Sequence, residues 1–183
     1  MDRSEAYALL TEYTQNPSLI KHALAVEVAM RAYARKFGED EETWGIIGLL
    51  HDFDYERYPT AEDHPYMGAE ILRAKKVPED WIISIMSHAD YTGIPRATLR
   101  DKVLFAVDEL SGFLVAVALV RPDKKIATVK VSSVKKKMKQ KAFSAQVSRE
   151  DIVKGAAELG IDLDEHIAFV IEAMTCIAAE LEL

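Results

Sequence analysis

The sequence has very little cysteine: Cys176 is the only thiol among 183 residues. One thiol excludes an intramolecular disulfide framework and a metal site built from several thiolates. A single cysteine suits a reducing compartment, and the N-terminus lacks the basic-then-apolar order of a signal peptide. We therefore expect a cytoplasmic protein in which Cys176, lying in an apolar helix, has a packing role.

Long apolar runs and sheet-like patterns are also missing. The most apolar stretch, Leu110 to Val120, is too short to cross a bilayer, so we expect no membrane partner. Proline and glycine are sparse and lie between segments of helical periodicity, and no alternating pattern occurs outside residues 126–131. These absences exclude a β-rich fold and predict an all-α protein whose residues 1–183 form a single domain.

Charge is unevenly distributed along the chain. The net charge is −7, yet residues 121–141 carry nine Lys or Arg and one acid, which leaves −15 for the remainder. The negative charge of the chain outside residues 121–141 argues against general nucleic-acid binding. The basic segment indicates either an anion site or a solvated helix face. Composition and net charge do not indicate the oligomeric state.

Apolar spacing and capping residues predict most of the chain to be helical. Ser18 and Asp40 are expected N-caps, Pro65 an expected first helical residue, and Thr98 and Ser148 open expected capping boxes. Residues 124–131 are expected to be irregular or briefly extended. The predicted helices are 2–14, 18–37, 41–52, 65–76, 79–88, 98–120, 134–143, 149–160 and 164–183.

The pair His51-Asp52 ends a strongly apolar run that begins at Trp44. An imidazole and a carboxylate are good ligands for a divalent cation, and neither tolerates an apolar setting without a partner. Further residues of the same two kinds flank the pair. They are His22 upstream and His64, His88 and Asp108 downstream.

Each histidine of this set also has a purely structural interpretation. His22 alone can be a helix-surface residue, His64 a helix-start residue and His88 a cation at a helix end. The pair His51-Asp52 and the acid Asp108 interrupt apolar segments, which favours a metal site for the whole set. Such nitrogen and carboxylate ligands suit iron, manganese, zinc, cobalt or nickel. The remaining histidine, His166, lies far along the chain and is interpreted as structural.

The order His…His-Asp…Asp resembles the signature of the HD-domain superfamily, which are all-helical metal-dependent phosphohydrolases. The resemblance covers about residues 18–120, with 121–183 as a C-terminal helical extension, and the additional His64 and His88 resemble its binuclear subset. It implies an HD-type helical bundle that binds one or two divalent ions. It also implies a first ion on His22, His51, Asp52 and Asp108, and a second on Asp52, His64 and His88.

The same resemblance implies hydrolysis of a phosphate ester or anhydride of a small molecule such as a nucleotide. A divalent ion lowers the pKa of a bound water toward ~7 and neutralises phosphate charge. Asp52, Asp54 and Glu109 are the candidate catalytic residues. Each of Asp54, Glu56 and Glu109 could act as a general base or could orient a metal-binding side chain. The candidate phosphate-binding residues are Lys130, Lys135, Lys136, Lys139 and Lys141, although such a run is also common on a solvated helix face.

Two other functions remain open on the sequence. The four-His, two-Asp set also resembles that of a few di-iron oxygenases with the HD fold. A metal-binding or nucleotide-sensing module without turnover is the alternative from a different class.

Overall fold

A computed structural model describes residues 1–183, which fold into helices and contain no strands. This confirms the all-α prediction. Two short 3-10 helices, η1 (Asp90–Thr92) and η2 (Ile126–Thr128), lie between longer elements. The α-helices are α1 (Arg3–Tyr13), α2 (Pro17–Phe37), α3 (Glu41–Leu50), α4 (Tyr66–Ala74), α5 (Glu79–Met86), α6 (Leu99–Leu119), α7 (Val131–Met138), α8 (Arg149–Leu159), α9 (Leu163–Thr175) and α10 (Ala178–Leu181).

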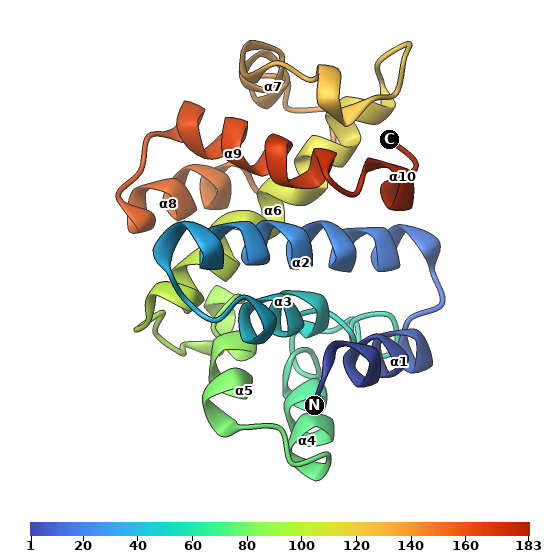
Figure 1. The fold of residues 1–183 in the computed structure, drawn as a ribbon, viewed down its shortest axis with the longest axis vertical. Coiled ribbons are helices and arrows are strands. Elements are labelled where there is room, and N and C mark those ends of the chain that lie inside the picture. Colours follow the sequence, from blue (N-terminus) through green and yellow to red (C-terminus); the bar gives the residue numbers. More distant parts are fainter.

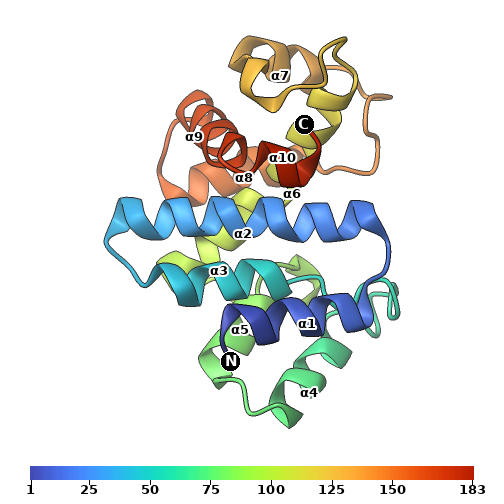
Figure 2. The same cartoon turned by 45° about the vertical axis from the view of Figure 1, so that its right-hand side comes forward.

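Helices α2 and α3 lie side by side across the middle of the molecule, and α6 crosses behind them (Figures 1 and 2). Every residue of α3 from Trp44 to Leu50 is buried, as its all-round apolar sequence predicts. Gly48 permits the close approach of α2, because a Cβ there would lie 2.9 Å from Met30 Cγ and 3.1 Å from the carbonyl oxygen of Val26. Close packing of α2 against α3 brings His22 and the end of α3 together.

The C-terminal helices belong to the same body as the rest of the chain. Helix α8 packs along α6, and α9 packs against both α2 and α6. On the other side of α3, α4 and α5 form the end of the molecule nearest the N-terminus (Figure 1). One hydrophobic cluster runs from Ala6 to Leu181, so the chain has a single continuous core.

His166 ties three helices together inside this core. The residue is fully buried, its Nε2–H donates to the carbonyl oxygen of Ala106 at 2.9 Å, and its Nδ1 accepts from the hydroxyl of Tyr33 at 2.7 Å. Both ring nitrogens are therefore satisfied by α6 and α2. The arrangement agrees with its interpretation as structural.

Several helix ends differ from the predictions by one to three residues. Asn16, not Ser18, caps α2, because its side chain accepts from the Ser18 N–H while Pro17 fills the first helical position. Pro65 precedes α4 as its N-cap. Helix α5 ends at Met86, so His88 follows the helix instead of ending it.

The C-terminal third holds the larger corrections. The basic helix spans 131–138 in place of 134–143. Within residues 124–131, predicted to be irregular or briefly extended, residues 126–128 form a 3-10 turn. The final helix breaks after α9, which puts Cys176 at a C-cap position. Cys176 is exposed, so the predicted packing role is wrong. The Ser148 side chain caps α8, but the reciprocal half of the capping box is not formed.

No helix has both the length and the apolar character needed to cross a membrane.

Candidate metal centre

Three ligand atoms converge from three different helices. His22 comes from the first turns of α2, His51 from the C-cap of α3 and Asp108 from the middle of α6. His22 Nε2 lies 3.0 Å from Asp108 Oδ1 and 3.2 Å from His51 Nε2, and His51 Nε2 lies 3.4 Å from Asp108 Oδ1. These residues form the first triad, although 86 positions separate His22 from Asp108.

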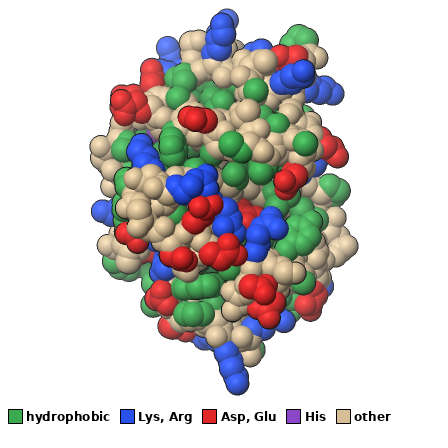
Figure 3. Space-filling model, in the orientation of Figure 1, with side chains coloured by type: hydrophobic (Ala, Val, Ile, Leu, Met, Phe, Trp, Pro, Cys, Tyr) green, Lys and Arg blue, Asp and Glu red, His purple; other side chains and the backbone are tan.

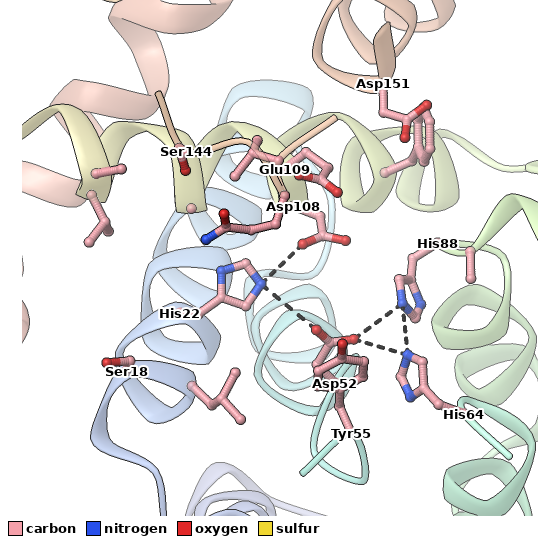
Figure 4. A pocket seen from close by; sticks show the side chains of 18 of the residues that line it. Ser18, His22, Asp52, Tyr55, His64, His88, Asp108, Glu109, Ser144 and Asp151 are labelled. Carbon is pink, nitrogen blue, oxygen red and sulfur yellow. Dashed lines mark hydrogen bonds and ion pairs between the residues drawn. The ribbon is translucent and has the colours of Figure 1, made fainter. Parts of the chain in front are cut away.

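A second triad lies beside the first. Asp52 Oδ1 is 3.2 Å from both His64 Nε2 and His88 Nε2, and the two imidazole nitrogens are 3.4 Å apart. His64 lies just before α4 and His88 just after α5 (Figure 4). Asp52, His64 and His88 are the second triad.

Asp52 connects the two triads through its two oxygens. While Oδ1 faces the second triad, Oδ2 lies 3.5 Å from His51 Nε2 and 4.0 Å from His22 Nε2. One carboxylate therefore presents one oxygen to each group of ligand atoms (Figure 4). A carboxylate placed in this way could be shared by two neighbouring cations.

Hydrogen bonds at Nδ1 fix the direction of three of the four imidazoles. His51 Nδ1–H donates to the Gly48 carbonyl, His88 Nδ1–H to the Ile85 carbonyl and His64 Nδ1–H to Asp54 Oδ1. In a neutral imidazole the Nε2 atom then carries a lone pair, and these lone pairs point at one another and at carboxylate oxygens. Only protons or bound cations can make such a group of acceptors stable.

The separations within each triad suit metal ions. Ligand atoms about 2.1 Å from one ion, at angles of 90° to 110°, lie about 3.0–3.4 Å apart. The atom pairs within both triads fall in this range. Imidazole nitrogen and carboxylate oxygen also form a borderline-hard ligand set that transition-metal ions favour. The residues present therefore fit two divalent ions.

The pKa shifts show how strongly the cluster favours positive charge. Burial acts to lower the pKa of His51, but the carboxylates of Asp52 and Asp108 outweigh burial and raise it to about 10. For His64, burial is likewise outweighed by Asp52 and Asp54, and the pKa rises to about 9. Burial acts to raise the pKa of Asp52, yet the surrounding imidazoles hold it well below its ordinary value.

The acids predicted as proton carriers have different surroundings. Both oxygens of buried Asp54 are occupied, Oδ1 by His64 Nδ1–H at 2.9 Å and Oδ2 by the Gly68 N–H at 2.8 Å. A Cβ at position 68 would lie 2.8 Å from this carboxyl group, so glycine is needed there. Asp54 thus orients the His64 imidazole and does not line the cavity that opens over the triads. Glu56 accepts two backbone N–H groups before α2 and is also outside it.

A cavity of about 660 Å³ opens over both triads. Glu109 lines it, and its Oε2 accepts from the Ser148 N–H at 3.1 Å. Burial first, and then the neighbouring Asp108 carboxylate, raise the pKa of Glu109 to about 7. Tyr55 and Tyr91 line the wall beside His64, Tyr55 with its ring edge-on to the imidazole and Tyr91 by donating to the His64 carbonyl at 3.0 Å.

Several lining residues were not expected from the sequence. Ser18, Tyr91, Gln146 and Asp151 all face the cavity. Asp151 is recognisable in the sequence only as part of a helix start, and nothing in its spacing relates it to the metal-ligand pattern. Its place follows from the packing of α8 along α6.

The basic segment lies away from the triads. None of the five candidate lysines lines the cavity. Val134 is the buried residue of α7, and Lys135 instead pairs with Asp164 at 2.7 Å. Lys and Arg side chains project into solvent at the end of the molecule where α7 lies (Figure 3). The five residues are Lys130, Lys135, Lys136, Lys139 and Lys141, all of them exposed.

Fold and site together define an all-helical protein with a His/Asp centre suited to divalent metal ions. A protein-family comparison matches residues 19–112 to the HD domain, and the chain belongs to this family. HD domains bind divalent metals and are mostly metal-dependent hydrolases. No curated protein and no solved structure matched the chain. The family assignment agrees with the resemblance inferred from the His and Asp residues.

Proposed function

We propose that this protein is a metal-dependent phosphohydrolase that cleaves a phosphate ester or anhydride of a small molecule, with nucleotides as the class to test first. The observation that carries the proposal is Asp52, whose two oxygens face two separate sets of nitrogen and oxygen ligands at the floor of an open cavity. Paired divalent ions in such a site supply a water of lowered pKa and neutralise charge on the phosphoryl group.

The residues of the two triads would bind the metal ions. Asp52 would hold both ions, His22, His51 and Asp108 the first, and His64 and His88 the second. Asp54 would keep His64 oriented through the 2.9 Å bond to its Nδ1. The metal-binding residues would then be His22, His51, Asp52, His64, His88 and Asp108.

Glu109 would carry a proton to or from the reacting group. It lines the cavity beside the ligand Asp108, and only one of its oxygens has a hydrogen-bond partner. The other oxygen is free to reach a substrate. Tyr55 and Tyr91 would flank the organic part of the substrate next to His64.

The test is phosphate release by protein loaded with Mn, Fe, Co, Ni, Mg or Zn, measured on a panel of nucleotides and simple phosphate esters. We expect release with at least one metal and loss of release in Asp52→Ala. Glu62→Ala is the matched control, because Glu62 is an exposed acid outside the cavity. No release with any metal and any ester would overturn the proposal.

Two other outcomes would assign a different function. Oxygen consumption by the iron-loaded protein with a mixed-valent iron signal would identify a di-iron oxygenase. Tight nucleotide binding with the nucleotide recovered unchanged after long incubation would identify a binding module.

A further inference from the structure

The wall of the cavity contains no lysine or arginine. Outside the metal-ligating residues, its charged side chains are three acids, Asp90, Glu109 and Asp151. A phosphohydrolase that binds a polyphosphate needs positively charged groups beside each of its phosphates. Apart from Arg96 and Lys154, which pair with the wall residue Asp90, positive charge in this cavity can come only from the metal centre.

Two of the three wall acids have no cationic partner. Asp90 pairs with Arg96 at 2.7 Å and with Lys154 at 2.5 Å. Neither Glu109 nor Asp151 takes part in an ion pair. Both side chains line the cavity, and Figure 4 shows them there. The negative charge of Asp151 therefore acts on whatever enters the cavity.

The cations next to the cavity are engaged elsewhere. Arg149 directs its guanidinium at the carbonyl oxygens of Phe143, Ser144 and Val147 and lies over the Phe113 ring. Arg96 is held by Glu158 at 2.8 Å as well as by Asp90. Neither side chain is free to approach an anion above the triads.

The rest of the wall suits an uncharged organic group. Leu19, Val115, Ala116 and Leu119 provide an apolar face from α2 and α6. Ser144 and Gln146 add neutral polar groups from the segment before α8. This face can hold an alkyl, sugar or aromatic group without requiring a charge.

Formal charge at the metal centre suffices for no more than one phosphate. Two divalent ions would bring four positive charges, of which Asp52, Asp108 and the buried Asp54 carboxylate beside His64 cancel three, so one phosphate dianion already uses up the remainder. A second phosphate or a carboxylate on the substrate would have no positive partner and would face Asp151.

We propose that the cavity selects phosphomonoesters whose organic part carries no second negative charge, and that the Asp151 carboxylate repels substrates with further negative charges. The proposal rests on the proposed function and narrows its substrate class. Nucleoside monophosphates fit this rule, whereas nucleoside di- and triphosphates and carboxylated phosphate esters do not.

The test uses probes that differ only at the end remote from phosphorus. Three alkylphosphonates with the same three-carbon chain, ending in an ammonium, a methyl or a carboxylate group, resist hydrolysis and share one metal-binding group. Their binding to the Mn²⁺-loaded protein is measured by calorimetry without oxygen. Hydrolysis of the corresponding phosphate monoesters, and of nucleoside mono- and triphosphates, is measured alongside.

We expect the carboxylate probe to bind about tenfold more weakly than the methyl probe, the size expected for one unit charge facing a half-buried carboxylate. Asp151→Asn should narrow this gap, and Asp151→Lys should reverse the preference between the carboxylate and ammonium probes. Glu150→Gln is the matched control, because Glu150 lies in the same first turn of α8, is exposed and does not line the cavity.

The outcomes separate the two proposals. Equal or tighter binding of the carboxylate probe by the wild type, or no shift in Asp151→Lys, overturns the charge selection while leaving phosphohydrolase activity in place. Charge-selective binding without hydrolysis of any ester supports the selection and overturns the hydrolase. Failure of every probe to bind, together with no hydrolysis of any ester, overturns both.

Discussion

The two triads present the same kinds of ligand but are built differently. The first triad comes from the long helices α2 and α6 and the end of α3, and these three helices pack on one another in the centre of the molecule. Backbone packing alone sets the positions of His22, His51 and Asp108. Only the His51 imidazole has an additional partner that fixes its ring.

The second triad lies in segments between helices. His64 and His88 flank the short helices α4 and α5, where backbone packing is less extensive. Here side-chain bonds supply the constraint, with Asp54 and Tyr91 both bonded to His64. One half of the site therefore depends on helix packing and the other half on an orienting carboxylate.

The largest effect is expected from Asp52, which belongs to both halves. Asp52→Ala should remove both ions, because each loses a carboxylate ligand, and phosphate release should become undetectable. Elemental analysis and the phosphate assay check this, with Glu62→Ala as control. Retention of two ions by Asp52→Ala would show that the carboxylate is not a bridge.

His22→Ala should affect only the first triad. His22 lies on the cavity side of α2 and its side chain is partly exposed, so the helix should fold without it. We expect one ion to remain per chain instead of two, measured by elemental analysis. Loss of both ions, with the helical circular dichroism unchanged, would mean that the triads are not separable.

Asp54→Asn should affect only the second triad. The amide oxygen can still accept from the Gly68 N–H, but the negative charge beside His64 is lost. We expect affinity for the second ion to fall about 10–100-fold, while the first ion is bound as before. Titration of the metal-free protein with Co²⁺ measures both steps, and Asp63→Asn is the control. If the affinities for the first and the second ion fell equally, Asp54 would not act on the second triad alone.

His166→Phe tests the core outside both triads. The change leaves the Tyr33 hydroxyl and the Ala106 carbonyl without their partner, which should lower the free energy of unfolding by about 1–3 kcal/mol. Metal content should stay at the wild-type level. Denaturant unfolding and elemental analysis check the two parts.

His166 should also make stability depend on pH. Burial, aided by Lys36, lowers its pKa below 6.5 in the folded protein, so the unfolded chain takes up a proton first as pH falls. Its stabilising contribution is therefore complete above about pH 6.5 and declines below that value. Between pH 7.5 and 5.5 the wild type should lose more stability than His166→Phe. An equal loss in the two proteins would contradict this reasoning.

The smallest effect is expected from the basic segment. Replacing Lys135, Lys136 and Lys139 together by Gln should change the catalytic efficiency for a phosphomonoester by less than about twofold, because these side chains are exposed and none lines the cavity. Steady-state kinetics at two salt concentrations check this. A loss of tenfold or more would show that the segment reaches the substrate.

Much of the fold could be predicted from the sequence, because its helices have clear signals. The all-round apolar run from Trp44 to Leu50 predicted a buried helix, and α3 is buried throughout. The Thr98 capping box also forms as predicted at the start of α6. Helix ends were less certain, since Asn16 and Ser18 both offer a side-chain oxygen and only the position of Pro17 decides between them.

The site was only partly predictable. A resemblance to HD domains related His22 to Asp108, since no local pattern connects residues so far apart in the chain. Asp151 and Tyr91 were missed because their place depends on how α8 and the η1 turn pack. Charge alone could not tell which way the lysines of α7 face, and the single buried residue of that helix, Val134, turns them toward solvent.

The convergence of both triads on Asp52 is tested most directly by anomalous diffraction from crystals grown with Mn²⁺. We expect two manganese peaks, one on each side of the Asp52 carboxylate, about 3.5–4 Å apart. A single peak, or peaks remote from Asp52, would contradict this expectation.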